Sequence, residues 1–269
     1  METKFKEKPQ AATGTEAATR TADVLLLFIS GSRVLGVSEI ARRLDLSKTV
    51  VFRILRSLLS RGFLVFDEKN RKYRLGPAAA ALGAHALRDL DLRQVALPFL
   101  RQLQQETDET TAVSGLVRAS FVYLDQVPSF QEIKMTIEVG RLFPLHTGAT
   151  GKAILTFAPP DIRQQVLTGH LAVLTSETKV TYEALKGDLE HILRTGVAVS
   201  FGERQSGAGS IAAPVIGFDG YAIGSICVCG PANRFGGESV ERFIPLVKDA
   251  ARKISIQLGW DGTELSTRI

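Results

Sequence analysis

Within residues 37–62, near the start of the chain, apolar residues recur at helical spacing in two short stretches, the first of which contains Val37, Ile40, Ala41 and Leu44. In the second stretch the apolar positions are Val51, Ile54, Leu55, Leu58 and Leu59. Asp45 and Leu46 separate the two stretches, and Ser47 carries the hydroxyl of a helix N-cap. The pattern predicts a helix-turn-helix whose second helix has an apolar back and a basic front. A helix of that kind suits the major groove of DNA.

Alternating apolar and polar residues follow directly in the stretch 63–75, around the turn-forming residues Asp67 to Asn70. We expect a β-hairpin, so that the whole module is a winged helix with Arg71, Lys72 and Arg74 on the wing. Residues 20–77 contain 12 Lys and Arg against 5 Asp and Glu, a net charge of +7, whereas the whole chain carries +5. The basic excess is confined to this module, as binding to phosphate groups requires.

The rest of the chain predicts a linker helix and an α+β domain. An alanine-rich stretch at 78–90 favours a helix, and the pattern from 91 to 260 alternates between strands and helices. The strands are expected at 110–117, 120–127, 133–139, 197–201, 210–218 and 221–229. Helices are expected at 146–157, 161–167, 182–193 and 240–258, and we place them on one face of the sheet.

The bulk properties fit a cytoplasmic protein of two domains. A chain of 269 residues with 45% hydrophobic and 23% charged residues is large enough for two cores and typical of globular proteins. Residues 1–19 are polar and lack the apolar segment of a secretory signal, so we expect a disordered tail and no membrane association. The two cysteines, Cys227 and Cys229, cannot form a disulfide framework, which favours a reducing compartment.

Motifs for catalysis, metals and cofactors fail on their spacing or context. The stretch HTGATGKA at 146–153 has His146 where a P-loop needs glycine and Ala153 where it needs serine or threonine. The glycines at 207–212 precede a predicted strand instead of a helix, which excludes a dinucleotide fingerprint. The four histidines are scattered, and the cysteine pair lacks a second metal-binding pair. We therefore expect no catalytic residues, no metal site and no cofactor.

From about residue 19 to residue 258 the sequence resembles the IclR-type family of bacterial transcription regulators. The segments that carry the resemblance are RTADVLLLF, LGVSEIARRLDLSKTVVFRIL, RGFLVFDEKNRKYRLG, DETTAVSGLV, LHTGATGKAIL and GSIAAPVIGFDGYAIGSICVCGP. It implies a winged helix-turn-helix DNA-binding domain at 20–77, a linker helix at 78–90 and a C-terminal GAF-like effector-binding domain at 91–260. It also implies a homodimer or homotetramer that binds a double-stranded DNA operator, answers to a small-molecule effector and often represses a catabolic operon.

The resemblance assigns candidate site residues to both domains. On the DNA-reading face they are Ser47, Lys48, Thr49, Val50 and Arg53, to which the wing adds Arg71 and Lys72. In the effector pocket they are Ala149, Thr150, Ser200, Ser210, Cys227 and Cys229. The two thiols are also open to interpretation as small core hydrophobes, and the resemblance favours the pocket.

The effector's class follows from these pocket positions. The helix beginning at Gly148 offers free backbone N–H groups, which suit a carboxylate. No lysine or arginine stands among the pocket positions, and we expect nearby Lys152 to point to solvent. The effector is therefore expected to be an organic acid with an apolar or aromatic body, in preference to a compact keto acid such as glyoxylate. The alternative is that a neighbouring loop supplies a cation and that a sugar acid or a small keto acid binds.

Two other functions compete with a ligand-responsive, sequence-specific DNA-binding regulator. The C-terminal domain could be an enzyme that acts on its bound small molecule, which turnover of the ligand would reveal. The winged helix could serve only protein contacts, against which the localised positive charge argues. The sequence favours the regulator over both alternatives.

Overall fold

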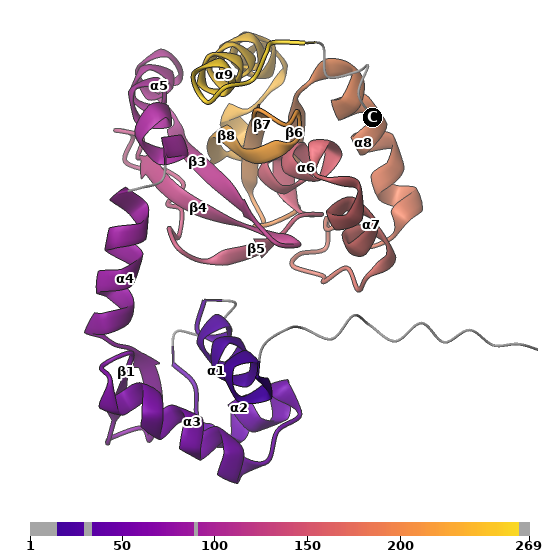
Figure 1. Ribbon diagram of the computed structural model, residues 1–269. Coiled ribbons are helices and arrows are strands. Elements are labelled where there is room, and N and C mark those ends of the chain that lie inside the picture. The colour runs from indigo at the N-terminus through magenta and orange to yellow at the C-terminus, as the bar shows by residue number, and fades with distance from the viewer. Residues whose placement is uncertain (1–14, 30–33, 89–90, 264–269) are drawn as a thin grey trace, which may run out of the picture. The chain divides into compact units, whose positions relative to one another are not determined.

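The computed structural model describes residues 15–29, 34–88 and 91–263, and the chain divides into two compact units, Met1–Gly83 and Ala84–Ile269 (Figure 1). The tail predicted at 1–19 lies outside the described residues up to residue 14. From Glu16 onward it is helical, so the prediction of disorder is wrong there. The reason is local: the sequence EAATR consists largely of good helix formers, and Arg20 pairs with Glu16 one turn away.

The first unit is a winged helix-turn-helix, as predicted. Its elements are α1 (Glu16–Leu27), α2 (Val37–Leu44), α3 (Lys48–Ser60), β1 (Leu64–Asp67) and β2 (Lys72–Leu75). The core joins Val24, Ile40, Val51, Leu55 and Leu64. Leu59 is 39% exposed, although the stripe on α3 predicted it buried. Leu59 lies about 80° around the helix from Val51, at the edge of the face that the other helices cover.

The turn between α2 and α3 depends on two residues with special backbone chemistry. Asp45 has left-handed dihedral angles of φ 52° and ψ 45°, which aspartate tolerates better than most residues. Ser47 is the N-cap of α3, and its hydroxyl accepts a hydrogen bond from the backbone N–H of Val50 at 3.3 Å. Both roles agree with the sequence, and together they fix where the recognition helix begins.

Helix α4 (Pro77–Arg88) forms where the alanine-rich stretch predicts it, beginning at a proline whose fixed φ suits a first helical position. The boundary between the two units falls inside this helix. No helix in the described part of the chain is both long enough and apolar enough to cross a membrane.

A six-stranded antiparallel sheet forms the centre of the second unit, in the order β5-β4-β3-β8-β7-β6. The strands are β3 (Thr110–Val117), β4 (Ser120–Val127), β5 (Leu142–Pro144), β6 (Ala198–Phe201), β7 (Ala208–Ile216) and β8 (Ala222–Pro231). This arrangement confirms the α+β class with a GAF-like sheet domain.

One predicted strand, 133–139, does not form. The side-chain amide of Gln126 occupies the place of a neighbouring strand, because it donates to the carbonyl of Ile137 at 2.8 Å and accepts from its N–H at 3.0 Å. Ile137 is thereby buried in an irregular loop, and the edge strand forms a few residues later as β5. Of the apolar residues of this stretch only Ile137 is buried, while Ile133 and Val139 are exposed, so the alternation corresponds neither to sheet pairing nor to a buried face.

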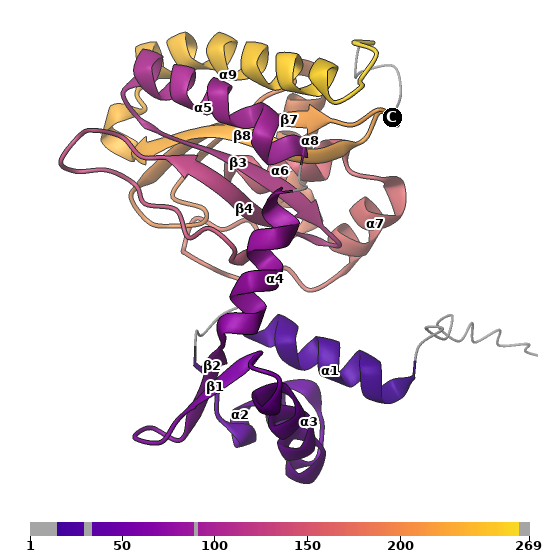
Figure 2. The same cartoon turned by 60° about the vertical axis from the view of Figure 1, so that its left-hand side comes forward.

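Helices cover both faces of the sheet, so the prediction of a single covered face is wrong. Helices α5 (Asp91–Thr107) and α9 (Gly237–Gln257) lie side by side on one face (Figure 2). On the other face lie α6 (Gly148–Phe157), α7 (Pro160–Thr168) and α8 (Tyr182–Thr195) (Figure 1). The central strands are apolar on both sides, as strands between two layers must be. Ile226 and Val228 pack toward α5 and α9, and Cys227 and Cys229 toward α6.

Two glycines offer a matched test of the packing around α6. A Cβ on Gly151 would lie 2.6 Å from the carbonyl oxygen of Leu145, whereas one on Gly187, in α8, would meet nothing within 4 Å. We expect Gly151→Ala to destabilise the second unit by roughly 1–3 kcal/mol through overpacking. Gly187→Ala should stabilise it by roughly 0.5–1 kcal/mol through helix propensity. Thermal unfolding of both variants checks this, and equal shifts would contradict the close approach at Gly151.

Candidate effector pocket and DNA interface

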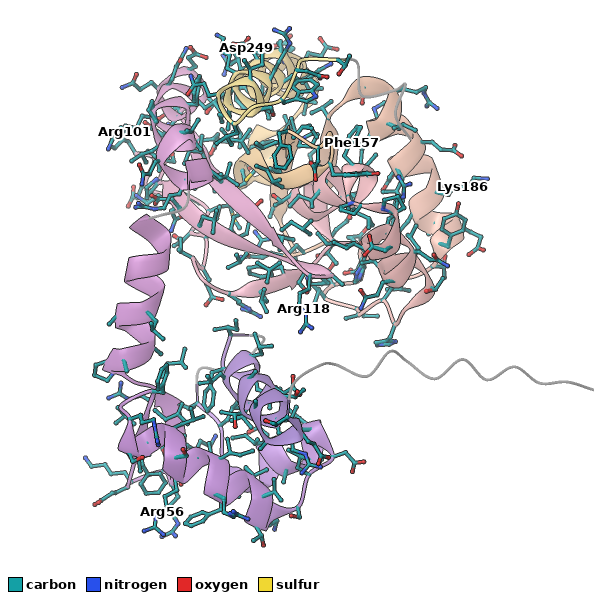
Figure 3. All side chains as sticks on the ribbon, in the orientation of Figure 1. Arg56, Arg101, Arg118, Phe157, Lys186 and Asp249 are labelled. Carbon is teal, nitrogen blue, oxygen red and sulfur yellow. The ribbon has the colours of Figure 1, made fainter. Side chains whose placement is uncertain are left out.

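The front of α3 is exposed along its first three turns. Ser47, Lys48, Thr49 and Arg53 are all exposed, and Val50 is half-buried. Arg56, one turn after Arg53, projects from α3 away from the rest of the unit (Figure 3). This face combines hydroxyl groups and cations, the donors that contact base edges and phosphates.

Phe52 also lies on this side of α3 and is 51% exposed, and the sequence analysis missed it. An exposed aromatic ring between cationic side chains can pack against a thymine methyl group or a sugar. The available signal was its position: Phe52 lies about 100° around the helix from Val51, on the side of Lys48 and Arg56.

The wing presents its cations through a tightly fixed loop. Asp67 accepts hydrogen bonds from the Lys69 backbone N–H at 2.9 Å and from the Asn70 side chain at 2.7 Å. Arg71 follows in the left-handed region, with φ 55°, and is exposed, while Lys72 is half-buried. The Asp67–Asn70 bond shapes the tip of the wing and leaves Arg71 in solvent.

In the second unit, strand pairing brings the candidate pocket residues into one row. Ser200 pairs with Ser210 between β6 and β7, and Ser210 pairs with Cys229 between β7 and β8. Directly paired residues point to the same face of an antiparallel sheet. These three side chains, remote in sequence, therefore stand next to one another beneath α6.

A small cavity of about 20 Å³ lies over this row. It is lined by Ser200, Ser210 and Cys229 together with Met135, Gly148, Gly202, Glu203, Arg204, Gln205, Ala208 and Gly209. A volume of this size holds about one water molecule. Of the other predicted pocket residues, Ala149, Thr150 and Cys227 are buried close by and do not line the cavity.

Arg204 supplies a cation that the sequence analysis did not place in the pocket. Its guanidinium lies 4.9 Å from the ring centre of Phe143 and 5.5 Å from that of Tyr123, while the residue also lines the cavity. Aromatic faces hold a guanidinium in a fixed orientation. The structure therefore brings a cation to this cavity from a neighbouring loop, the one after β6, which is the alternative that the sequence left open.

Lys152 is buried, with 1% exposure, contrary to the expectation that it points to solvent. Its ammonium contacts Glu203 at 2.5 Å and Asp188 at 2.8 Å, and Asp188 also pairs with Lys179 at 2.7 Å. A buried ammonium needs such partners, because an unpaired charge in the interior is costly.

Glu203 also accepts a hydrogen bond at 3.2 Å from the backbone N–H of Gly148, the first residue of α6. The helix N-terminus that was expected to receive an effector carboxylate therefore already holds one from the chain itself. This leaves Arg204 as the anion-binding group that faces the cavity.

Two thiols and two hydroxyls complete the wall behind the cavity. The hydroxyl groups of Tyr123 and Thr150 lie 3.2 Å apart, and burial raises the pKa of Tyr123. The hydrogen bond from the Cys229 thiol lowers the pKa of Cys227, and contacts with Thr150 and Arg204 act in the same direction. The same thiol contact, together with burial, raises the pKa of Cys229.

Among the described residues, no group of three or more histidine, cysteine or acidic side chains is arranged to hold a metal ion. The residues that sequence reasoning missed are Tyr123, Asp188, Glu203 and Arg204. Glu203 and Arg204 stand in the loop directly after Ser200, so charged residues next to a predicted pocket strand were the available signal. Asp188 lies three residues after Leu185 and four before Ile192, the buried residues of α8, so a carboxylate within an apolar stripe was the available signal.

Comparison with known families agrees with this architecture in both units. The family described as "Bacterial transcriptional regulator IclR C-terminal" matches residues 84–256, and "IclR helix-turn-helix domain" matches residues 17–68. This chain belongs to the IclR family. It is therefore a DNA-binding transcriptional regulator, and the members of the family that it matches are regulators rather than enzymes.

Individual relatives cover almost the full length of this IclR-family chain. The HTH-type transcriptional regulator KdgR of Escherichia coli K12 is 30% identical over 237 residues, 88% of this chain and 90% of KdgR. The crystal structure of an IclR transcriptional regulator from Alicyclobacillus acidocaldarius superimposes with a TM-score of 0.78 at 28% identity, covering 91% of this chain and all of that one. An IclR homologue from Microbacterium hydrocarbonoxydans, complexed with 4-hydroxybenzoate, gives 0.68 at 26% identity over 90% and 99%.

The ion pairs around Lys152 predict a pH-dependent stability. Burial alone would raise the pKa of Asp188, but hydrogen bonds from Lys152 and Lys179 outweigh it, so the folded-state pKa lies below its usual value. The stabilisation is therefore present above about pH 4 and lost as the pH falls through the folded-state pKa. Asp188→Asn should cost roughly 1–3 kcal/mol at pH 7, and less under acid conditions.

The matched control is Asp249→Asn, which removes an exposed pair with Lys253 on α9. This change should cost less than about 0.5 kcal/mol at any pH. Thermal unfolding at several pH values measures both. A cost for Asp188→Asn that does not shrink in acid would contradict the role of its charge.

Proposed function

We propose that this IclR-family protein is a cytoplasmic repressor of a catabolic operon that binds its operator as a homodimer or homotetramer and responds to an organic acid. DNA binding is assigned to the exposed face of α3 and the wing, and effector binding to the cavity beside Arg204. The observation that carries the effector assignment is a half-buried guanidinium, held against two aromatic rings, that lines the same cavity as Ser200, Ser210 and Cys229.

The proposed DNA contacts are of two kinds: contacts to base edges, which recognise sequence, and contacts to phosphates, which do not. Lys48, Thr49, Val50 and Arg53 stand where a recognition helix meets base edges, with Phe52 as an added apolar contact. Ser47 acts through the cap that begins α3. Arg71 and Lys72 on the wing are assigned to phosphates, which position the protein without reading sequence.

The effector is assigned by its carboxylate. Arg204 offers a fork of N–H donors, and the serine hydroxyls of the row offer further hydrogen bonds. The rings of Tyr123 and Phe143 lie beside that cation and provide an apolar wall, consistent with an apolar or aromatic body. Because the closed cavity holds about one water, we propose that the acid widens it on binding, and that this movement is what changes DNA affinity.

Two arginine variants distinguish base recognition by α3 from phosphate contact by the wing. Arg53→Ala should cost roughly 1–3 kcal/mol on the operator and relax base preference, because a guanine edge loses a bidentate partner. Arg71→Ala should weaken all DNA sequences alike and reduce the slope of log affinity against log salt by about 0.9. Fluorescence anisotropy with selected and random duplexes measures both. If Arg53→Ala weakened binding to the selected and the random duplexes equally, Arg53 would not read a base. If the unmodified protein bound neither kind of duplex, the winged helix would instead serve contacts with other proteins.

The role of Arg204 is tested with a panel of monocarboxylates that includes aromatic acids, pyruvate and glyoxylate. Acids that raise the melting temperature of the wild type should bind Arg204→Gln about 10–100-fold more weakly, because a charge-assisted hydrogen bond contributes roughly 1.5–3 kcal/mol. Arg141→Gln is the control, since Arg141 also lies over Phe143, at 5.1 Å, and does not line the cavity. If both variants lost affinity for the acids equally, or if neither lost any, Arg204 would not be the group that binds the effector carboxylate.

A further inference from the structure

The chain turns back at the end of α9 and thereby buries its single tryptophan, Trp260. Gly259 has a φ of 95°, and its backbone N–H donates to the carbonyl of Ile256 at 3.1 Å. The N–H of Trp260 donates to the carbonyl of Ser255 at 3.0 Å. This is the pattern by which a glycine in the left-handed region ends a helix. It folds Trp260 into the core beside Ile216, where the residue is 9% exposed.

The indole of Trp260 has a buried donor that no acceptor satisfies. Its Nε1 is enclosed, and among the residues that the structure describes it is the one buried side-chain nitrogen or oxygen without a hydrogen-bond partner. A buried tryptophan N–H usually finds an acceptor, because leaving one unpaired costs free energy. An acceptor from outside the described residues would remove this cost.

Trp260 lines a cavity of about 220 Å³ between the last turns of α9 and the edge of β7. The cavity lies at this edge because β6 pairs with residues 209–212 of β7, and no strand in the described part of the chain continues that pairing along 213–216. A cavity of about 150 Å³ accommodates benzene, so this one has space for a substituted ring. Its apolar wall consists of buried residues, namely Ala213, Pro214, Ile216 and Ala251.

Two cations stand at the mouth of this cavity without an acidic partner. Lys248 and Arg252, one turn apart on α9, both line the cavity and are exposed. Neither forms an ion pair with any residue in the described ranges. Asp249 lines the cavity as well, but its carboxylate pairs with Lys253 at 2.6 Å. The charge available to a ligand at the mouth is therefore positive.

We propose that this cavity is a second small-molecule site, which binds an aromatic monocarboxylate whose ring carries an oxygen acceptor opposite the carboxylate. The ring lies against the apolar wall, the oxygen accepts from the indole N–H of Trp260, and the carboxylate pairs with Lys248 and Arg252. The indole donor is covered by its surroundings, so binding includes a small turn of that ring toward the ligand. No residue lines both this cavity and the one beside Arg204, and the proposal does not depend on the proposed function.

The single tryptophan provides a direct readout of the site. Full-length protein labelled with ¹⁵N should give one indole N–H resonance, that of Trp260. The probe is para-acetylbenzoate, whose carbonyl oxygen is an acceptor. Its matched control, para-isopropenylbenzoate, has the same shape and charge but carries a CH₂ group in place of that oxygen. We expect para-acetylbenzoate to shift the indole proton downfield, as a new hydrogen bond does, and to bind roughly 2–10-fold more tightly than the control.

Variants on α9 and at the indole test the two ends of the ligand. Lys248→Gln and Arg252→Gln should each weaken para-acetylbenzoate binding about 2–5-fold, because each removes an exposed ion pair. Arg242→Gln is the control, since it removes the same charge from the same helix and does not line the cavity. Trp260→Phe keeps an aromatic wall without the donor, so it should bind both compounds equally in calorimetry. Circular dichroism verifies folding, and the two compounds make the same comparison on the unmodified protein.

The outcomes distinguish this site from the proposed effector cavity. If the indole resonance did not move with millimolar para-acetylbenzoate, or if Arg204→Gln abolished its movement, there would be no second site at Trp260. If the acetyl and isopropenyl compounds bound equally well to the unmodified protein, the indole would not be the ligand's donor. An indole shift that persists in Arg204→Gln while no acid binds beside Arg204 would overturn the effector assignment and support this site.

Discussion

The buried ammonium of Lys152 is the interaction on which the geometry of the effector pocket depends. It joins α6, which carries it, to Asp188 on α8 and to Glu203 in the loop after β6. An unpaired charge in the interior is costly. Movement of the loop after β6 would take Glu203 away from the ammonium of Lys152, so the ion pair holds this loop in place. Arg204 is the next residue of this loop, so the cation that faces the cavity owes its position to the ion pair beside it.

The same side-chain chemistry serves opposite purposes in the two units. In the first unit, the cations of α3 and the wing stand in solvent, where they are available to phosphates and bases. In the second unit, acids hold the buried ammonium of Lys152, and aromatic rings hold the half-buried guanidinium of Arg204. A cation in solvent attracts any polyanion, whereas a cation in a small cavity selects a ligand by size and shape.

Local patterns in the sequence were sufficient for the elements of the first unit. The cap at Ser47, the left-handed turn at Asp45 and the stripe through Val51 and Leu55 are decided by interactions within a few residues, and the structure agrees with each. The strand assignment of 133–139 failed because the side chain of Gln126, distant in sequence, takes the hydrogen bonds of a strand partner. The apolar periodicity of this stretch predicted neither which of its residues are buried nor which group satisfies their backbone.

The sequence by itself determined the winged helix-turn-helix, the confinement of positive charge to it, the α+β class of the second domain and three of the residues that line its cavity. Only the tertiary structure decided the polar identity of that cavity. Strand register placed Ser200, Ser210 and Cys229 in one row, and ion pairing turned Lys152 inward and brought Arg204 to the site. The ion pair between Lys152 and Glu203 joins residues 51 positions apart, and the energy of such a contact depends on burial, which no local pattern encodes.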